Sequence, residues 1–378
     1  MIKTRKTLIF SICICTFLSL CGCNQKTKTF DSNMYISSET LMPDGFIYSD
    51  DGVVTSYLNQ ETLEISPYCS NANCIHNDSS CQARLYDGTE RGPIPYGNCI
   101  YYFSKAEEEW LDNDKDGREE TPIIKDSLMC YNLENDETKC VASWEGTAGC
   151  CYNGACILDD NIYFIGVRGY TEFSDLPGLE TPENIPMECR LYRFDLKAEK
   201  LKDYGSLYDN DLQYSGAAST RSLILRGVSD DNIYFMYSYL EDISQEDTME
   251  NEKHICIKLD PSNDNISVEN EAAPELICDG YRCHTENDNA FVKKGDKTWE
   301  FPAIRGGFLN NQLTIANDSV WYINGEESWY YDLKEEQKTD FSVSEPLGES
   351  PCVISADSTS CVIKYLENGA YSFRRVSL

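Results

Sequence analysis

The chain has 378 residues, of which 41% are hydrophobic, and its 64 acidic and 32 basic side chains give a formal net charge of −32. A field of that sign repels phosphate backbones, which excludes nucleic acid as the expected partner. The 25 tyrosines, together with the lack of a long 3.6-residue apolar period, favour strands over helices.

Residues 1–22 have the layout of a secretory signal peptide. A basic start (residues 3–6) precedes an apolar run over residues 8–18, shorter than the roughly 20 residues that a membrane-spanning helix needs. The run ends in Leu20-Cys21-Gly22-Cys23, which resembles the bacterial lipobox, whose last cysteine receives the lipid. The resemblance implies that Cys23 is the lipidated first residue of the mature protein. A simple signal peptide or an N-terminal anchor is the alternative interpretation.

Residues 23–33 are polar and lack apolar periodicity, so we expect a short flexible tether. With diacylglycerol and palmitate on Cys23, the tether would hold the protein to the cell membrane on its extracytoplasmic face. We expect the folded domain over residues 34–378, as a monomer.

A hexapeptide occurs twice in this domain. Asp-Asp-Asn-Ile-Tyr-Phe stands at residues 159–164 and again at 230–235, and looser relatives lie at 96–103 and 317–323. Each copy is a polar turn that runs directly into an apolar and aromatic strand. The recurrence predicts one structural unit that is repeated along the chain.

Pairs of strand-like runs follow one another along the chain, separated by Gly, Asn and Asp turns. Six pairs are clear: 45–49 with 53–58, 98–103 with 127–133, 161–165 with 189–196, 232–236 with 254–260, 319–323 with 329–333, and 361–365 with 370–374. Residues 287–305 form a degenerate seventh candidate. In most pairs the second run ends in Asp or Asn followed by Leu, and a turn of charged residues comes next.

This pattern resembles the blades of β-propellers of the TolB type and the low-density-lipoprotein-receptor type. The resemblance is greatest to uncharacterised propeller lipoproteins of clostridia, which are Firmicutes, and it covers about residues 34–378. It implies an all-β propeller of seven blades, with six or eight blades as alternatives. The rival architecture is two β-sandwich domains. It implies nothing about chemistry, because the fold hosts many functions.

The segment 69–81 contains three thiols and an imidazole, from Cys69, Cys74, His76 and Cys81. This is the ligand set of a structural zinc site, and thiolates are soft donors that suit Zn²⁺. The spacing matches neither a zinc knuckle nor a zinc finger. A disulfide between two of the cysteines, which export permits, and unmodified thiols are the alternatives. A similar stretch recurs in the clostridial lipoproteins that the chain resembles.

An acidic insertion at 107–123 contains a second candidate ion site. Oxygen ligands at alternate positions, followed by Gly117, match the first half of an EF-hand-type Ca²⁺ loop. The ligands would be Asp112, Asp114, Asp116 and Glu119. The match fails at the twelfth position, which is Ile123 instead of Glu. A solvated acidic loop is the alternative.

The sequence contains no catalytic motif. Its three histidines lie outside any recognisable triad or metalloprotease context, and neither a Gly-x-Ser-x-Gly elbow nor a phosphate-binding Gly loop occurs. We therefore expect a protein that binds a protein or glycan ligand, or acts as a scaffold, at the loop face or central channel of the propeller. An extracellular glycan-active hydrolase or lyase on the same fold is the alternative.

Overall fold

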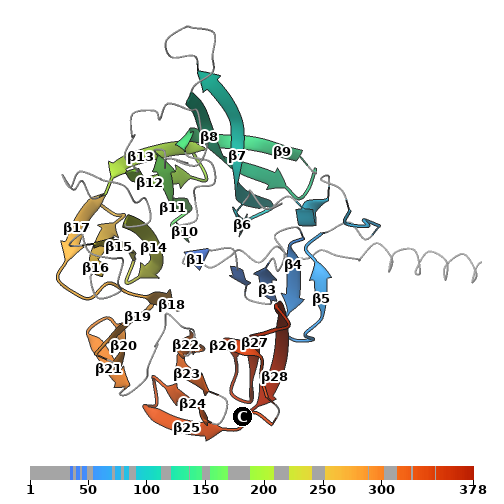
Figure 1. Ribbon diagram of the computed structural model, residues 1–378, viewed down its shortest axis with the longest axis vertical. Coiled ribbons are helices and arrows are strands. Elements are labelled where there is room, and N and C mark those ends of the chain that lie inside the picture. The colour runs from blue at the N-terminus through green and yellow to red at the C-terminus, as the bar shows by residue number, and fades with distance from the viewer. Residues whose placement is uncertain are drawn as a thin grey trace, which may run out of the picture.

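The described residues of the computed structural model form seven β-sheets arranged as the blades of a propeller around a central axis (Figure 1). The structure describes residues 35–36, 40–42, 45–48, 54–69, 73–77, 81–84, 91–111, 121–135, 137–146, 154–168, 188–207, 221–240, 252–287, 289–301, 313–324, 327–344 and 346–378. The prediction of an all-β propeller with seven blades is confirmed.

Each blade is built from consecutive antiparallel strands, which we call A to D from the channel outward. Blade 1 contains β2 (Thr40–Met42), β3 (Gly45–Tyr48), β4 (Ser56–Asn59) and β5 (Ile65–Pro67). Blade 2 contains β6 (Arg91–Tyr96), β7 (Cys99–Leu111), β8 (Thr121–Asn132) and β9 (Glu137–Gly146). Blade 3 contains β10 (Ala155–Leu158), β11 (Asn161–Arg168), β12 (Glu188–Asp195) and β13 (Lys200–Ser206). Blade 4 contains β14 (Arg221–Ser229), β15 (Asn232–Leu240), β16 (Glu252–Asp260) and β17 (Asn265–Glu269).

The remaining blades are more compact. Blade 5 contains β18 (Leu276–Cys278), β19 (Tyr281–Glu286), β20 (Asn289–Lys294) and β21 (Lys297–Phe301). Blade 6 contains β22 (Leu313–Ala316), β23 (Ser319–Asn324), β24 (Glu327–Asp332) and β25 (Gln337–Phe341). Blade 7 has three strands, β26 (Glu349–Ala356), β27 (Ser360–Glu367) and β28 (Ala370–Ser377). A short 3-10 helix, η1 (Gln82–Arg84), lies between blades 1 and 2, and β1 (Tyr35–Ile36) precedes blade 1.

The repeated hexapeptide forms the turn between strands A and B. Asp159-Asp160 joins β10 to β11, Asp230-Asp231 joins β14 to β15, and these four residues have φ values between 49° and 60°. Two successive residues with positive φ make a type I′ hairpin turn, and Asn and Asp tolerate that conformation better than other non-glycine residues. The two copies therefore occupy equivalent places in neighbouring blades, as the repeat predicted.

The Asp-Leu pattern after strand C also has a structural reason. The Asp195 carboxylate accepts hydrogen bonds from the backbone N–H groups of Lys197 (2.9 Å) and Ala198 (2.7 Å), which closes the C–D turn of blade 3. The N–H of Leu196 donates to the carbonyl of Asp160 at 2.9 Å and so joins this turn to the A–B turn. Asp332, Leu333 and Asp318 repeat the arrangement in blade 6.

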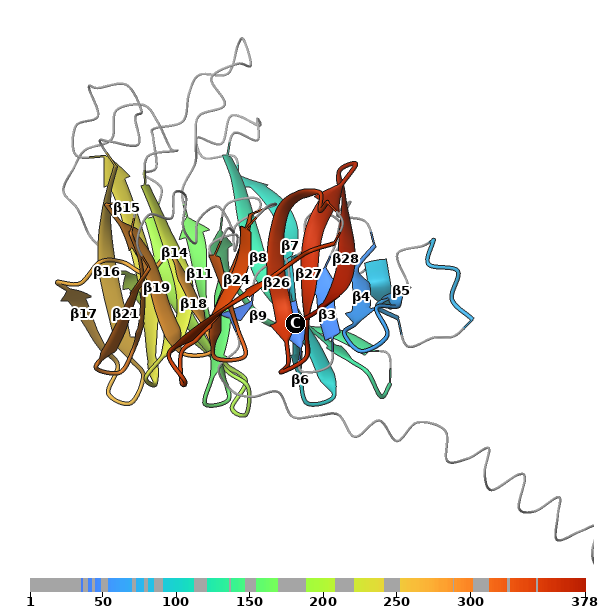
Figure 2. The same cartoon turned by 90° about the horizontal axis from the view of Figure 1, so that it is seen from below.

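These turns divide the propeller into two faces. In an antiparallel blade the A–B and C–D turns lie at one end, which we call the turn face, and the B–C connections lie at the other, the loop face. The hairpin turns of blades 3 to 6 lie along the lower side in Figure 2, and strand B of blade 4 (β15) runs upward from them. In blades 2 to 4 the B–C connections contain residues 112–120, 169–187 and 241–251, whereas in blades 5 to 7 two residues suffice.

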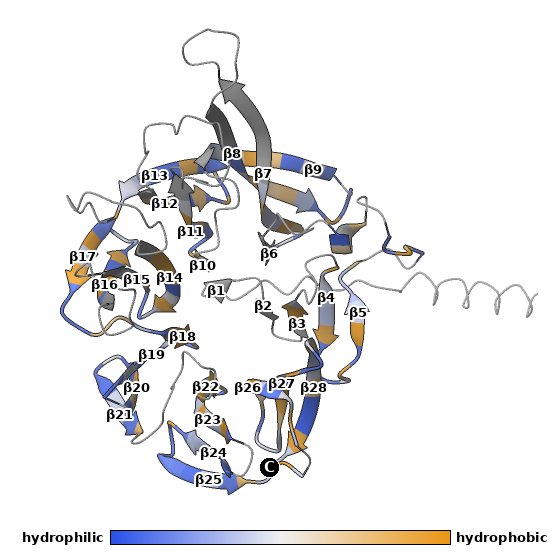
Figure 3. Ribbon diagram, viewed as in Figure 1, coloured by the Kyte–Doolittle hydropathy of each residue, from blue (hydrophilic) through white to orange (hydrophobic). Residues whose placement is uncertain are grey.

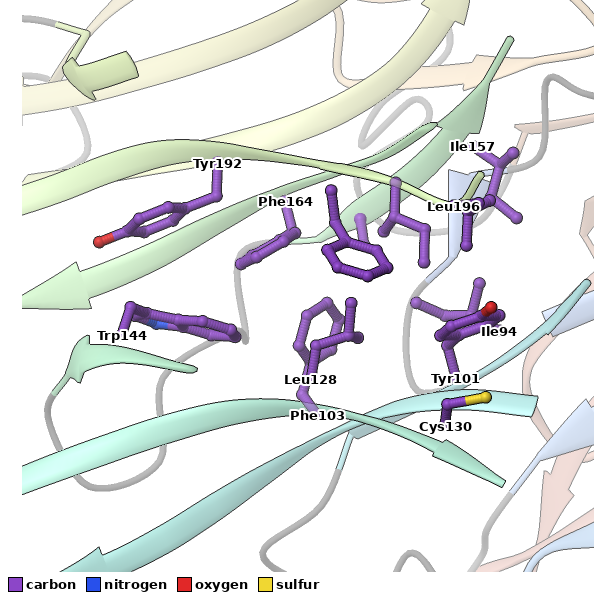
Figure 4. Close-up of a cluster of buried hydrophobic side chains, with 13 residues drawn as sticks. Ile94, Tyr101, Phe103, Leu128, Cys130, Trp144, Ile157, Phe164, Tyr192 and Leu196 are labelled. Atoms are coloured by element: carbon purple, nitrogen blue, oxygen red, sulfur yellow. The ribbon is translucent and has the colours of Figure 1, made fainter. Parts of the chain in front are cut away.

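The hydrophobic core is divided among the seams between adjacent blades. A cluster from blades 2 and 3 contains Phe103, Trp144, Phe164 and Tyr192, with ring centroids 4.8–5.4 Å apart between Phe164 and its three aromatic neighbours. Figure 4 shows these rings between the strands of the two blades. The inner strands are largely apolar, and all four residues of β3 and of β10 are buried, while outer strands such as β25 are largely hydrophilic (Figure 3).

Side-chain contacts between blades 7 and 1 close the ring. Phe46 and Tyr48 of β3 pack against Phe373 and Tyr371 of β28, with ring centroids 5.2–6.0 Å apart. The Arg375 guanidinium bonds the carbonyls of Gln60 and Glu61 in blade 1 as well as Ser360 Oγ in blade 7. Blade 7 thus joins blade 1 without a strand shared between them.

Two expected boundaries need correction. The insertion at 107–123 is in part a continuation of the blade, because β7 and β8 pair as far as Leu111 and Thr121. The degenerate candidate at 287–305 belongs to blade 5, which is a regular four-stranded blade, and it contains strands C and D of that blade, β20 and β21. In each of the six other blades, the predicted pair of runs corresponds to strands B and C.

Candidate metal centre

The predicted Cys/His cluster lies in the connection from blade 1 to blade 2. Cys69 follows β5, and Cys81 directly precedes η1. The backbone fixes both ends of the connection to blade 1, since Tyr68 N–H donates to the carbonyl of Thr55 (2.8 Å) and Thr55 N–H donates to that of Ala83 (2.7 Å). Both ends of the segment are thus held against the start of strand C.

The structure brings all four predicted ligands together. One donor atom from each of Cys69, Cys74, His76 and Cys81 lies within 4.8 Å of the others. His76 Nδ1 is 3.2 Å from Cys81 Sγ. A tetrahedral zinc ion with Zn–S bonds near 2.3 Å separates its sulfur ligands by about 3.8 Å. Small side-chain adjustments would therefore bring the four donors to coordination distance.

Backbone amides support the sulfur atoms. The N–H of His76 donates to Cys74 Sγ at 3.4 Å, and His76 has a φ of 55°, in the left-handed region. The amide of Ala83 also bonds the Cys81 sulfur, and this bond lowers the pKa of that thiol. Burial and the neighbouring Cys74 and Cys69 outweigh it and raise the pKa of Cys81 to about 11. Amide–sulfur bonds of this kind orient thiolates around a metal.

The cluster adjoins a small hydrophobic seam. Between blades 1 and 2 the buried residues are Ile100, Tyr102 and Tyr131, with Tyr68 packed beside them. Tyr68 directly precedes Cys69, so the first ligand is anchored to this seam. In contrast, the seam between blades 2 and 3 buries thirteen residues in one cluster, counted among those that the structure describes.

The cysteines of the blades form a separate class. The buried members of this class are Cys130, Cys156, Cys256, Cys283, Cys352 and Cys361. Burial raises the pKa of Cys256 to about 11 and that of Cys361 to about 12. These residues behave as small hydrophobes in strands, as their apolar sequence context predicted.

The other predicted sites lie outside the described residues. These are the lipidation site Cys23 and the four candidate Ca²⁺ ligands Asp112, Asp114, Asp116 and Glu119. Residues 1–22 and 23–33 also lie outside them. Within the part of the chain that the structure describes, no helix is both long and apolar enough to span a membrane.

Sequence analysis missed one contact between chemically active side chains. Ser238 Oγ lies 2.8 Å from His254 Nδ1, across directly paired positions of β15 and β16. Residues sixteen apart give no motif, and only the strand register joins them. The Ser238 side chain is 3% exposed, so its hydroxyl is not presented to a substrate in solvent. The contact is best explained as a cross-strand hydrogen bond.

A cavity of about 410 Å³ opens where blades 7 and 1 meet on the turn face. Its lining includes Glu61, Asp357, Ser360 and Arg375. Arg375 and Asp357 already bond neighbouring groups, Arg375 as described above and Asp357 to the backbone N–H groups of Thr359 and Ser360. The cavity therefore belongs to the closure of the ring.

No family model matches the chain, and none of the curated proteins does. Among solved structures, an oligogalacturonate lyase from Vibrio parahaemolyticus is similar over 92% of this chain and 89% of its own, with 11% identity and a TM-score of 0.38. A puromycin-hydrolyzing peptidase of Mycobacterium tuberculosis is similar over 92% of this chain and 54% of its own, with 10% identity and a TM-score of 0.45. The Cps50 (Swd1) β-propeller domain of Myceliophteria thermophila is similar over 93% of this chain and 99% of its own, with 11% identity and a TM-score of 0.38.

Proposed function

We propose that this protein is a lipid-anchored, extracytoplasmic β-propeller that binds a protein or glycan through its loop face. One observation supports this most: the long connections within blades 2, 3 and 4 all join strand B to strand C and therefore leave the sheets at the same face. The A–B turns, by contrast, need only two residues. Propellers bind where such connections converge.

The sequence of these connections favours a partner with positive charge or hydrogen-bond donors. Residues 241–251 include Glu241, Asp242, Glu246, Asp247 and Glu250 and no Lys or Arg. A cluster of acidic groups attracts basic surfaces and increases the rate of association. We therefore favour a partner that presents a basic patch.

Binding through this face can be tested by photo-crosslinking on cells. A photoreactive amino acid placed within 241–251 should form adducts with a partner. The same amino acid in the turn at Gly295-Asp296 of blade 5, on the turn face, is the matched control. Adducts from the control alone would contradict the assignment of the loop face.

The alternative, a glycan-active hydrolase or lyase, has its own test. Such an enzyme needs paired carboxylates or a metal with an open coordination position. The Cys/His cluster offers four protein donors, which is a closed set and fits a structural ion. Release of new reducing ends or unsaturated products from polysaccharides by the purified mature domain would overturn the binding function.

We also propose that the cluster holds one structural zinc ion. Three thiols form at most one disulfide, which would leave a thiol and the imidazole of His76 without a role, whereas zinc engages all four groups. The converging donors and the amide–sulfur bonds support this assignment.

Metal analysis and thiol counting test the zinc site. The purified mature domain should contain about one equivalent of zinc, and Cys74→Ser should lose it. Cys140→Ser is the control, because Cys140 is an exposed free thiol in β9, outside the cluster. A metal-free protein with a disulfide mapped between two of Cys69, Cys74 and Cys81 would overturn the proposal.

A further inference from the structure

The N-terminal strand β1 lies inside the ring, away from blade 7. Tyr35 and Ile36 pair with Cys156 and Ala155 of β10, so β1 becomes a fifth strand at the channel edge of blade 3. It also lies against β6 and β14, the innermost strands of blades 2 and 4. Figure 1 shows β1 near the axis of the ring.

The direction of β1 follows from its pairing. Strand A of blade 3, β10, runs from the loop face to its turn at Asp159-Asp160 on the turn face. Because β1 is antiparallel to β10, it runs from the turn face towards the loop face. Its first residue, Tyr35, pairs with Cys156, which is closer to that turn than Ala155 is. The backbone therefore enters the channel from the turn face.

Ion pairs neutralise part of the negative charge of the turn face. Asp318 pairs with Lys334, Glu199 with Lys139 (2.6 Å), and Glu336 with Lys297 (2.5 Å). Asp264, in the C–D turn of blade 4, bonds Lys202 at 2.6 Å as well as Arg193. Such pairs add little stability at a surface, but they reduce the local negative field.

We propose that the acylated N-terminus holds the propeller with its turn face towards the membrane and its loop face outward. The proposal rests on the lipid anchor of the proposed function. The tether that the sequence predicts between Cys23 and Tyr35 would have a mean end-to-end distance of about 20 Å, which would keep the turn face close to the lipid surface. The partner is thus the membrane on one face and a soluble or cell-surface ligand on the other.

The entry of β1 can be tested on the purified mature domain, independently of any lipid. Directly opposed positions of antiparallel strands have Cα atoms about 4.5–5.5 Å apart, within the range of a disulfide. Tyr35→Cys should therefore cross-link to the native Cys156 on mild oxidation. Ile36→Cys, which faces Ala155, should not form this link.

The peptide map of the oxidised protein decides the result. A link between position 35 and Cys156 supports the register, and a link from position 35 to another cysteine overturns it. If the two thiols stay reduced because Cys156 is buried, the exchange experiment below decides. If Tyr35→Cys does not fold, amide hydrogen exchange provides the test. Deleting residues 24–36 should accelerate exchange at Ala155 and Cys156, and unchanged exchange would overturn the proposal.

Orientation on the membrane can be tested with two insertions in blade 5. A short epitope after Asn287, in the two-residue B–C turn, lies on the loop face. The same epitope between Gly295 and Asp296, in the C–D turn, lies on the turn face. On protoplasts that carry the acylated protein, an antibody fragment should label the first several-fold more than the second, and detergent should make the two equal.

The outcomes separate this proposal from the anchor itself. If mass spectrometry finds no acyl group on Cys23 and the protein is in the medium, the anchor and the orientation both fail. Acylated protein whose two epitopes are labelled equally on protoplasts overturns the orientation and leaves the anchor intact. Preferential labelling of the Gly295 insertion would show the opposite orientation.

Discussion

Two adjacent seams of the ring are held together in different ways. Between blades 2 and 3, Phe103, Trp144, Phe164 and Tyr192 stack in a continuous aromatic cluster. Between blades 1 and 2, the described core consists of Ile100, Tyr102 and Tyr131, and four convergent metal-type ligands lie beside it. In blade 1, β5 has only three residues, and two of them, Ile65 and Ser66, are exposed. The zinc ion proposed above would provide a cross-link where hydrophobic burial is small.

The aromatic seam should show the largest effect of a single substitution. Phe164→Ala removes a fully buried ring that contacts three others, and such a change costs about 3–5 kcal/mol of unfolding free energy. Urea unfolding monitored by tryptophan fluorescence measures it. The matched change at the small seam, Tyr131→Ala, should cost less. Equal losses would remove the distinction between the seams.

Removal of metal should affect blade 1 before the rest of the ring. If zinc supports the weak seam, a strong chelator should accelerate amide exchange in β4 and β5 and leave β11 and β12 unchanged. Cys74→Ser should give the same pattern without chelator, and chelator should then have no further effect. Uniform acceleration over all blades would show that the ion stabilises the propeller as a whole.

Gly166 sharpens the comparison from within the aromatic seam. A Cβ atom at this position would lie 2.7 Å from Tyr192 Cε2 and 3.0 Å from Trp144 Nε1. Gly166→Ala should therefore displace one of the two rings and cost about 1–3 kcal/mol. Gly97→Ala is the control for packing, because a Cβ there meets nothing within 4 Å, although its positive φ adds strain. Thermal unfolding of both variants distinguishes crowding from strain.

A smaller effect is expected from a polar contact between blades 2 and 3, at the same seam. The Tyr96 hydroxyl of blade 2 donates to the Asp160 carboxylate of blade 3, and Lys197 bonds the same carboxylate. These two bonds lower the pKa of Asp160 below its ordinary 3.8. The stabilisation is therefore complete above pH 3.8 and is lost as the pH falls through the lowered pKa. Tyr96→Phe should lower Tm slightly at pH 7, and the difference should vanish in acid. A difference in Tm that stays constant with pH would contradict a stabilising role of the Tyr96–Asp160 hydrogen bond.

The propeller could be predicted because its turns leave a local signature. Asp-Asp before a strand supplies the positive φ of a type I′ turn, and Asp-Leu after strand C supplies the Asx bonds of the next turn. Blade 5 was harder to recognise because Asp279-Gly280 replaces the paired acids in its A–B turn. The four ligands of the metal cluster were predictable from their closeness in sequence. The Ser238–His254 contact and the path of β1 depend on register between distant strands, which no local pattern encodes.

The dispersed thiols of the blades also constrain where this chain can mature. In the finished propeller, burial raises the pKa of Cys130 and Cys361 to about 12, and thiols held in this way react slowly with oxidants. Before the blades assemble, the same groups are exposed to one another along a mobile polypeptide. An oxidase present at that stage would link them at random and trap the chain in species that no rearrangement of blades can rescue. The architecture therefore suits an environment that is poor in disulfide-forming catalysts.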